Sequence, residues 1–168
     1  GITTTQTITN TITLDLNSHT LSGTTATRLF YLNTADKYLT ITDSRSGGKI
    51  VATATAATQS AIEIAKGNVI LTGGTITLTS SAATAYGIKS AAGTQIAATA
   101  GTINVSATSN AYGIYAADKL SLAGVTINAT TTSTTGAYAI YSTSTAANET
   151  ITDVEDLPTL IYSGTYTA

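Results

Sequence analysis

The chain has no cysteine, methionine or tryptophan, and it has a single proline among its 168 residues. Without cysteine it has no disulfide framework, no thiol nucleophile and no Cys-ligated metal site. Only 10% of the residues are charged, and the seven Lys and Arg residues are spread singly, so no basic cluster suited to nucleic acid exists. No apolar run approaches the roughly 20 residues that a membrane span needs. These absences argue against redox, nucleic-acid-binding and membrane-spanning proteins.

What the chain has in abundance is threonine, which accounts for 39 of the 168 residues. With a formal net charge of −2, the surface is expected to be close to neutral and rich in hydroxyl groups. Such a surface suits an extracellular wall or matrix component better than a cytoplasmic enzyme, so we expect an extracellular or cell-surface location. The alternative is that threonine is abundant because its branched side chain fits a β-strand.

Apolar residues recur along the chain at a nearly constant spacing. One series is spaced by 26 residues each time and consists of Ile62, Ile88, Ile114 and Ile140. A second series, spaced by 26, 27 and 24 residues, consists of Ile50, Ile76, Ile103 and Ile127. A third set of apolar runs begins at Leu39, Val69, Gln95 and Leu120. A fixed period of this size indicates a repeat architecture, in which each unit is stable only against its neighbours.

Each period contains three short runs in which apolar and polar residues alternate, as in Thr75–Thr79. Alternation with period two places one face inside and one outside, as in a strand, and no window shows a helical stripe. The sequence therefore predicts an all-β fold, a single-stranded parallel β-helix in which each strand pairs with its equivalent one coil away. We expect one domain over residues 1–168, with about six coils of ~26 residues and three short strands in each coil.

The repeats are similar to those of a known group of proteins. The stretch Ile12–Gly23, followed by Leu39–Ser44 and Gly47–Ile50, resembles repeats in secreted microbial proteins, as do the later Gly-Gly-Thr-Ile and Tyr-Gly-Ile segments. These are the right-handed β-helix, pectate-lyase-like modules of bacterial and archaeal adhesin-like surface proteins, and the resemblance extends over roughly residues 8–162. It implies an architecture but no activity, because this fold hosts lyases, tailspikes, adhesins and passive stalks.

Acids that could serve catalysis are few. A polysaccharide lyase on this fold needs clustered acids for Ca²⁺ and a basic residue, and a hydrolase needs paired carboxylates. The only neighbouring acids on aligned strands are Asp15 and Asp43, one coil apart, with Arg45 nearby. We expect both carboxylates to cap turns by accepting hydrogen bonds from their own backbone.

Metal-binding residues are equally sparse. His19 has no second His or Cys near it in sequence, which disfavours a metal role. The densest acidic patch consists of Asp153, Glu155 and Asp156, shortly before Pro158, and we expect a solvated turn there. The sequence therefore predicts no catalytic residue, no metal ligand and no cofactor.

Three tyrosines recur at the repeat spacing: Tyr86, Tyr112 and Tyr138. An outward column of this kind would offer sugars a stacking strip. Because these tyrosines share strand parity with the inward isoleucines, we expect instead a stacked ladder at the edge of the core or at a corner. An outward row should follow the isoleucines and contain Glu63, Lys89, Tyr115 and Tyr141, with Glu63 beside Lys89 and Lys89 able to rest on Tyr115. Arg28 has no partner that the sequence identifies.

The second isoleucine series is flanked by an outward column of Thr and Asn. A flat threonine array on a solenoid can bind ice, but Lys49 and Val51 interrupt this one. Asn104, Asn128 and Asn148 each begin a glycosylation sequon and are candidate glycosylation sites. Two of the three, Asn104 and Asn128, lie in the outward column.

Neither end of the chain shows an amphipathic helix that would cap a solenoid. Uncovered strand edges invite another copy by strand addition, and head-to-tail contacts that do not close generate filaments. We therefore expect the terminal strands, residues 1–10 and 158–168, to contact a neighbouring subunit through Ile2, Ile8, Leu160 and Ile161. The alternative is a piece excised from a longer β-helix protein, which a start at Gly1 without Met also favours.

The sequence is best interpreted as a non-catalytic extracellular structural β-solenoid, the subunit of a cell-surface fibre or adhesin that assembles end to end. The first alternative is a carbohydrate-binding module that uses outward Thr, Asn and Tyr side chains. Further alternatives are a polysaccharide lyase or hydrolase and an ice-binding protein. The partners expected are other copies of the chain and surface glycans, without nucleic acid or a membrane span.

Overall fold

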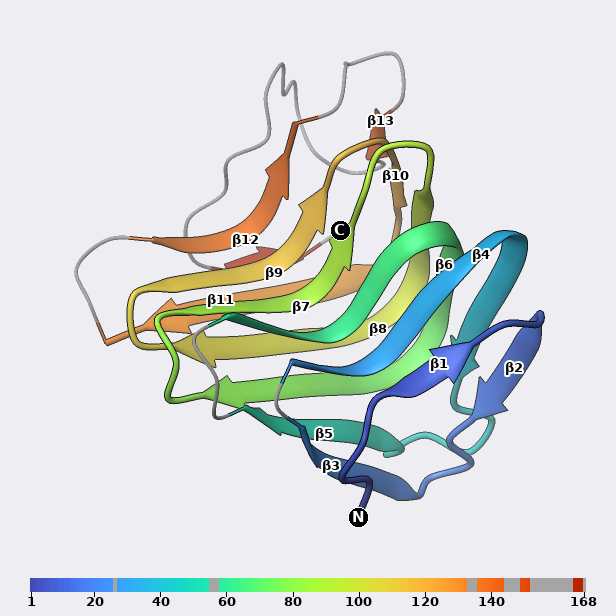
Figure 1. Cartoon of the computed structure of the whole chain (residues 1–168), viewed down its shortest axis with the longest axis horizontal. Coiled ribbons are helices and arrows are strands. Elements are labelled where there is room, and N and C mark those ends of the chain that lie inside the picture. The colour runs from blue at the N-terminus through green and yellow to red at the C-terminus, as the bar shows by residue number, and fades with distance from the viewer. Residues whose placement is uncertain (26, 55–57, 133–135, 144–148, 152–164, 168) are drawn as a thin grey trace.

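The computed structural model describes residues 1–25, 27–54, 58–132, 136–143, 149–151 and 165–167. In this part of the chain every regular element is a strand, and the strands form one continuous coiled sheet. The chain winds as a parallel β-solenoid of about 5 turns (Figure 1). The predicted all-β solenoid is therefore confirmed, with slightly fewer coils than expected.

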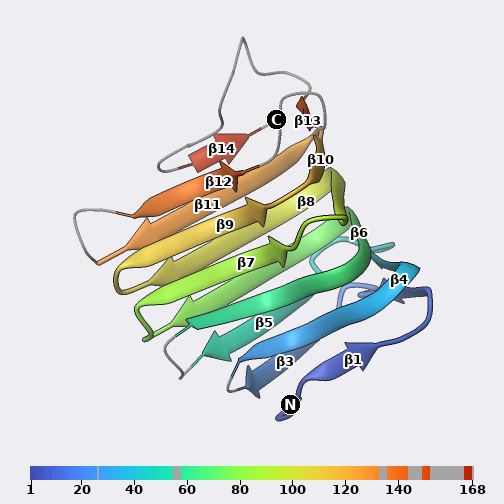
Figure 2. The same cartoon turned by 45° about the horizontal axis from the view of Figure 1, so that its top comes forward.

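The sheet has three faces, and equivalent strands of successive coils stack along each (Figure 2). Three long strands bend around corners and so belong to more than one face. β4 runs through the first and second faces, β8 through the second and third, and β6 through all three. The first face contains β1 (Gln6–Ile8), β4 (Arg28–Thr42), β6 (Thr58–Ser80), β7 (Thr84–Ser90), β9 (Asn110–Ala116) and β12 (Ala137–Ser142). The second adds β2 (Ile12–Asp15), β8 (Gln95–Ala107), β10 (Lys119–Leu122) and β13 (Glu149–Ile151). The third adds β3 (Thr20–Thr25), β5 (Lys49–Ala54), β11 (Val125–Thr131) and β14 (Thr165–Thr167).

The core consists of columns of apolar side chains that run through the stack. Strand register pairs Phe30 with Ile62 and continues the first column through Ile88, Ile114 and Ile140. The second column runs from Leu21 through Ile50, Ile76, Ile103 and Ile127, and the third from Ile12 through Leu39, Val69, Ile96 and Leu120. All eight isoleucines of the two predicted series are 0% exposed. Both predicted columns are therefore confirmed.

The strand alternation breaks at one corner of the first face. In β7 the buried residues are Ala85, Gly87, Ile88 and Ser90, so two neighbours, Gly87 and Ile88, both point inward. β9 has the same burial pattern. The alternation of inward and outward residues is therefore displaced by one position after Gly87. As a result, Tyr86 and Lys89 both face outward on the same side. The tyrosines therefore do not point inward although they share sequence parity with the isoleucines, while the stacked ladder predicted for them is confirmed.

Both ends of the stack make contacts within the chain. Ile2 donates its N–H to the Ser22 carbonyl and accepts from the N–H of Thr24, and Ile8 is buried in the core. At the other end, β13 pairs with β10, and β14 lies antiparallel to β11. Leu160 and Ile161, the other expected intersubunit contacts, lie outside the described residues. Contact of these termini with another copy stays a prediction.

Candidate functional site

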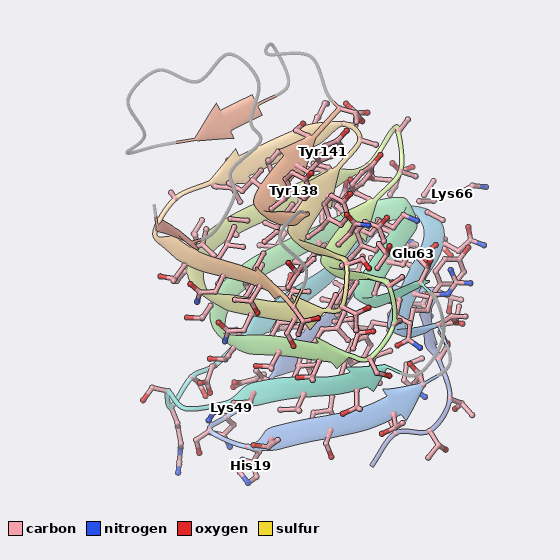
Figure 3. All side chains as sticks on the ribbon, turned by 90° about the vertical axis from the view of Figure 1, so that its left-hand side faces the viewer. His19, Lys49, Glu63, Lys66, Tyr138 and Tyr141 are labelled. Atoms are coloured by element: carbon pink, nitrogen blue, oxygen red, sulfur yellow. The ribbon has the colours of Figure 1, made fainter. Side chains whose placement is uncertain are left out.

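The most distinctive surface lies on the first face and consists of five tyrosines, called here the tyrosine face. It contains two ladders that run along the solenoid, one of Tyr86, Tyr112 and Tyr138 and the other of Tyr115 and Tyr141. In the first ladder the rings stack with centroids 4.9 and 5.0 Å apart, and in the second they are 5.3 Å apart. Figure 3 shows Tyr138 and Tyr141 close together, far along the stack from His19 and Lys49.

The two ladders contact each other edge to face. Rings of one ladder meet those of the other at interplanar angles of 70° to 86°, with centroids 5.5 to 5.9 Å apart. Both offset stacking and edge-to-face contact are favourable arrangements of aromatic rings. Because the ring faces within a ladder cover one another, the tyrosine face presents ring edges and phenol groups to its surroundings. Desolvation by burial, reinforced by the neighbouring phenols, raises the pKa of Tyr86 and Tyr112 above its usual value.

A short row of charges continues the first face toward the N-terminal end. Register places Glu63 next to Lys89, as predicted. However, Glu63 makes its ion pair with Arg28, at 2.7 Å between Oε1 and Nη1, and Lys89 lies over the ring of Tyr86 at 5.0 Å instead of resting on Tyr115. Arg28, for which the sequence identified no partner, also lies 3.9 Å above the ring of Tyr31.

A pocket of about 150 Å³, called here the Ser60 pocket, opens between this charged row and the tyrosine face. Two of its lining residues, Gln59 and Ser60, are buried, and Gln59 donates to the Thr25 carbonyl. This pocket was not predicted from the sequence, because its lining comes from β4, β6 and β7 in three successive coils and from Thr27 just before β4. The lining residues are Thr27, Arg28, Thr58, Gln59, Ser60, Glu63, Tyr86 and Lys89.

The two aspartates singled out in the sequence hold turns, as expected. Asp15 accepts hydrogen bonds from the backbone of Asn17 and Ser44, and Asp43 from the backbone of Ser18 and Gly48. Each carboxylate thus fixes a turn in its own coil and one in the adjacent coil. Hydrogen bonding, chiefly with Ser44, lowers the pKa of Asp15.

Other candidate residues do not converge on a metal site. Nδ1 of His19 lies 2.6 Å from the Asn17 carbonyl oxygen. Among the residues that the structure describes, no three His, Cys, Asp or Glu side chains gather as a metal site. The acidic patch of Asp153, Glu155 and Asp156 lies outside these residues.

A larger pocket of about 350 Å³ lies at another corner of the solenoid. It is lined by the charged residues Asp36, Lys66, Asp118 and Lys119 and by nine further residues.

The third face carries the predicted Thr and Asn column. Register aligns Thr77 with Asn104 and Asn128, and Nδ2 of Asn128 donates to Oδ1 of Asn104 at 2.8 Å. The partly buried side chains of two candidate glycosylation sites therefore contact each other in the middle of a sheet. Asn148, the third, lies outside the described residues.

Comparisons with protein-family models, curated proteins and solved structures found no match for this chain. In the described part of the chain, no helix is long and apolar enough to cross a membrane. What is established is a parallel β-solenoid of about 5 turns, and a pectate-lyase-like or adhesin family remains a prediction from the resemblance.

Proposed function

We propose that the chain is a non-catalytic structural subunit of an extracellular fibre or adhesin and that it assembles end to end. The observation that carries this proposal is the way the apolar core ends. Ile12, the first member of the third core column, is 37% exposed, whereas its neighbour Leu39 is 0% exposed. The core thus reaches the N-terminal end of the stack without a cover in the described residues.

Backbone groups at the same end support the proposal. Among the described strands, β1 and β2 pair only with β4, so each has one edge that no described strand occupies. An open strand edge next to exposed apolar side chains is a template for strand addition. A second copy stacked on this end would pair those edges and cover Ile12 and the partly buried Leu14.

The proposal includes no catalytic step. The carboxylates of Asp15 and Asp43 are engaged with backbone N–H groups of turns, which is a structural task. The extracellular assignment is supported by the threonine-rich, weakly charged composition.

Electron microscopy of the purified chain, combined with sedimentation velocity over a range of concentrations, tests the assembly. We expect rods that lengthen with concentration and whose width is that of one solenoid. A single species of monomer mass at every concentration would contradict the proposal.

A second candidate, carbohydrate binding, is favoured by the outward tyrosine face. Its phenol groups and ring edges, together with Lys89, offer hydrogen bonds and apolar contact to a glycan. A glycan array tests it: binding by the native chain should be lost in a Tyr115→Ala variant that remains folded. Equal signals from both proteins would exclude the tyrosine face as the binding surface.

A further inference from the structure

The row that contains the longer tyrosine ladder has a position where an aromatic ring is missing. Register aligns Tyr138, Tyr112 and Tyr86 in successive coils, and the same row continues through Ser60 to Arg28. Tyr86 therefore stacks on a tyrosine on one side, while on the other side its rung neighbour is a small serine. We propose that the Ser60 pocket, which opens at this position, binds a planar aromatic carboxylic acid. This inference does not rest on the assembly or glycan proposals, although the pocket shares Tyr86 and Lys89 with the surface named for glycans.

The size of the pocket suits one aromatic ring. Its volume is about 150 Å³, and an interior cavity of about 150 Å³ is sufficient to bind benzene. Adjacent rungs are about 4.8 Å apart, so a ring at the level of Ser60 would lie one rung from Tyr86 and one from Arg28. Tyr112 already stacks on the other side of Tyr86 at 4.9 Å, and a bound ring would repeat that spacing.

Arg28 can complete the stack from the opposite side. A guanidinium is planar and packs well against aromatic faces. Arg28 already lies 3.9 Å from the ring centroid of Tyr31, and its ion pair with Glu63 holds it beside the pocket. A ligand ring between Tyr86 and Arg28 would therefore meet an aromatic ring and a guanidinium that are both held in place by existing contacts.

The charges around the pocket favour an anion. Arg28 and Glu63 form an ion pair at 2.7 Å and largely neutralise each other. Lys89 then leaves the pocket with one excess positive charge. Its ammonium lies 5.0 Å from the Tyr86 ring, a weak contact at a partly exposed site, and its flexible stem allows it to reach a bound carboxylate. At the rim, the exposed hydroxyl groups of Thr27 and Thr58 can bind a polar ring substituent.

The test is an NMR titration of the isotopically labelled full chain with 4-hydroxybenzoate. We expect saturable shifts centred on the amides of Ser60, Tyr86 and Lys89. Two matched probes separate the contributions: 4-hydroxybenzyl alcohol lacks the charge, and cyclohexanecarboxylate lacks the aromatic ring. Each should bind about three- to tenfold more weakly, which is the size expected for loss of one charge-assisted or stacking contact.

Variants locate the site. Lys89→Gln and Tyr86→Leu should each weaken 4-hydroxybenzoate binding about three- to tenfold, whereas Lys66→Gln and Tyr38→Leu, at exposed positions elsewhere, should leave it unchanged. Ser60→Tyr supplies the missing ring from the chain itself and should abolish binding. If Ser60→Tyr does not fold, the other two variants decide. Absence of saturable shifts, equal affinity for the uncharged probe, or unchanged binding by Lys89→Gln would overturn the proposal. So would a neutral disaccharide that displaces 4-hydroxybenzoate, since the pocket would then be a sugar site.

Discussion

At the scale of single residues, the corner of the first face depends on two positions without a side chain. Gly87 and Gly113 are buried beside the isoleucines that follow them. Neither has a positive φ, so space sets the requirement and not backbone conformation. A Cβ on Gly113 would meet Cγ2 of Ile127 and the carbonyl oxygen of Ala139. The Tyr-Gly-Ile motif that the sequence repeats thus has a steric cause that spacing alone does not show.

Gly113→Ala should destabilise the fold by about 1–3 kcal/mol, because the added methyl group forces its packed neighbours apart. The equivalent residue one coil further is Ala139, so Ala139→Gly is the matched control and should lose about 1 kcal/mol or less. Urea unfolding of the three proteins gives both values. A Gly113→Ala variant as stable as the native chain would show that the corner can expand.

Ile88→Asn should destabilise the fold by about 3–5 kcal/mol, since it removes a fully buried apolar side chain and places an amide in an apolar core that offers it no hydrogen-bond partner. The control is Ile70→Asn, because Ile70 is an outward, half-buried isoleucine on the second face. Its loss should be below about 1 kcal/mol. Comparable losses at both positions would contradict the assignment of an inward and an outward face.

At the scale of the element, the strands and their register could be predicted from the sequence. The side chains that face outward at a corner, and the pairs they form, could not. The 26-residue spacing of Ile62 and its successors gives the pairing, because equivalent residues of successive coils must stack. The outward direction of Tyr86 could not be derived from period-two alternation, which fails where Gly87 and Ile88 both point inward. The Arg28–Glu63 pair was missed because the partners lie in adjacent rows, a relation that depends on side-chain reach.

The tyrosine face should make stability sensitive to alkali. The pKa values of Tyr86 and Tyr112 are raised in the folded state, so folding favours the neutral phenols. This contribution is fully present below the unfolded pKa of about 10 and is lost as the pH rises through the folded pKa. Urea midpoints should therefore fall as the pH rises above about 10, and fall less in Tyr112→Phe. Tyr38→Phe, outside the tyrosine face, is the control and should follow the native curve. Identical curves of urea midpoint against pH for all three proteins would mean that ionisation of Tyr112 does not lower the free energy of unfolding.

At the scale of the whole molecule, the two ends of the solenoid are not equivalent. At the C-terminal end, β13 extends the second face parallel to β10, whereas β14 lies antiparallel along β11 on the third face. At the N-terminal end, Ile2 bridges to β3, while the outer edges of β1 and β2 have no partner among the described strands. The sequence predicted ends without capping helices, but an antiparallel return such as β14 has no periodic signal and was not predicted.

At the N-terminal end, a single added charge should therefore prevent self-association while leaving the folded monomer almost as stable. Ile12→Lys should change the stability of the monomer by about 1 kcal/mol or less, because Ile12 is already 37% exposed. In a stacked assembly the same lysine would have to leave water without a partner, which costs several kcal/mol. We expect the native chain to form longer species as its concentration rises in sedimentation velocity, and Ile12→Lys to remain monomeric. Thr79→Lys, exposed on the third face away from both ends, should assemble like the native chain. If Ile12→Lys elongated as readily as Thr79→Lys, the exposed end of the core would not be the contact between subunits.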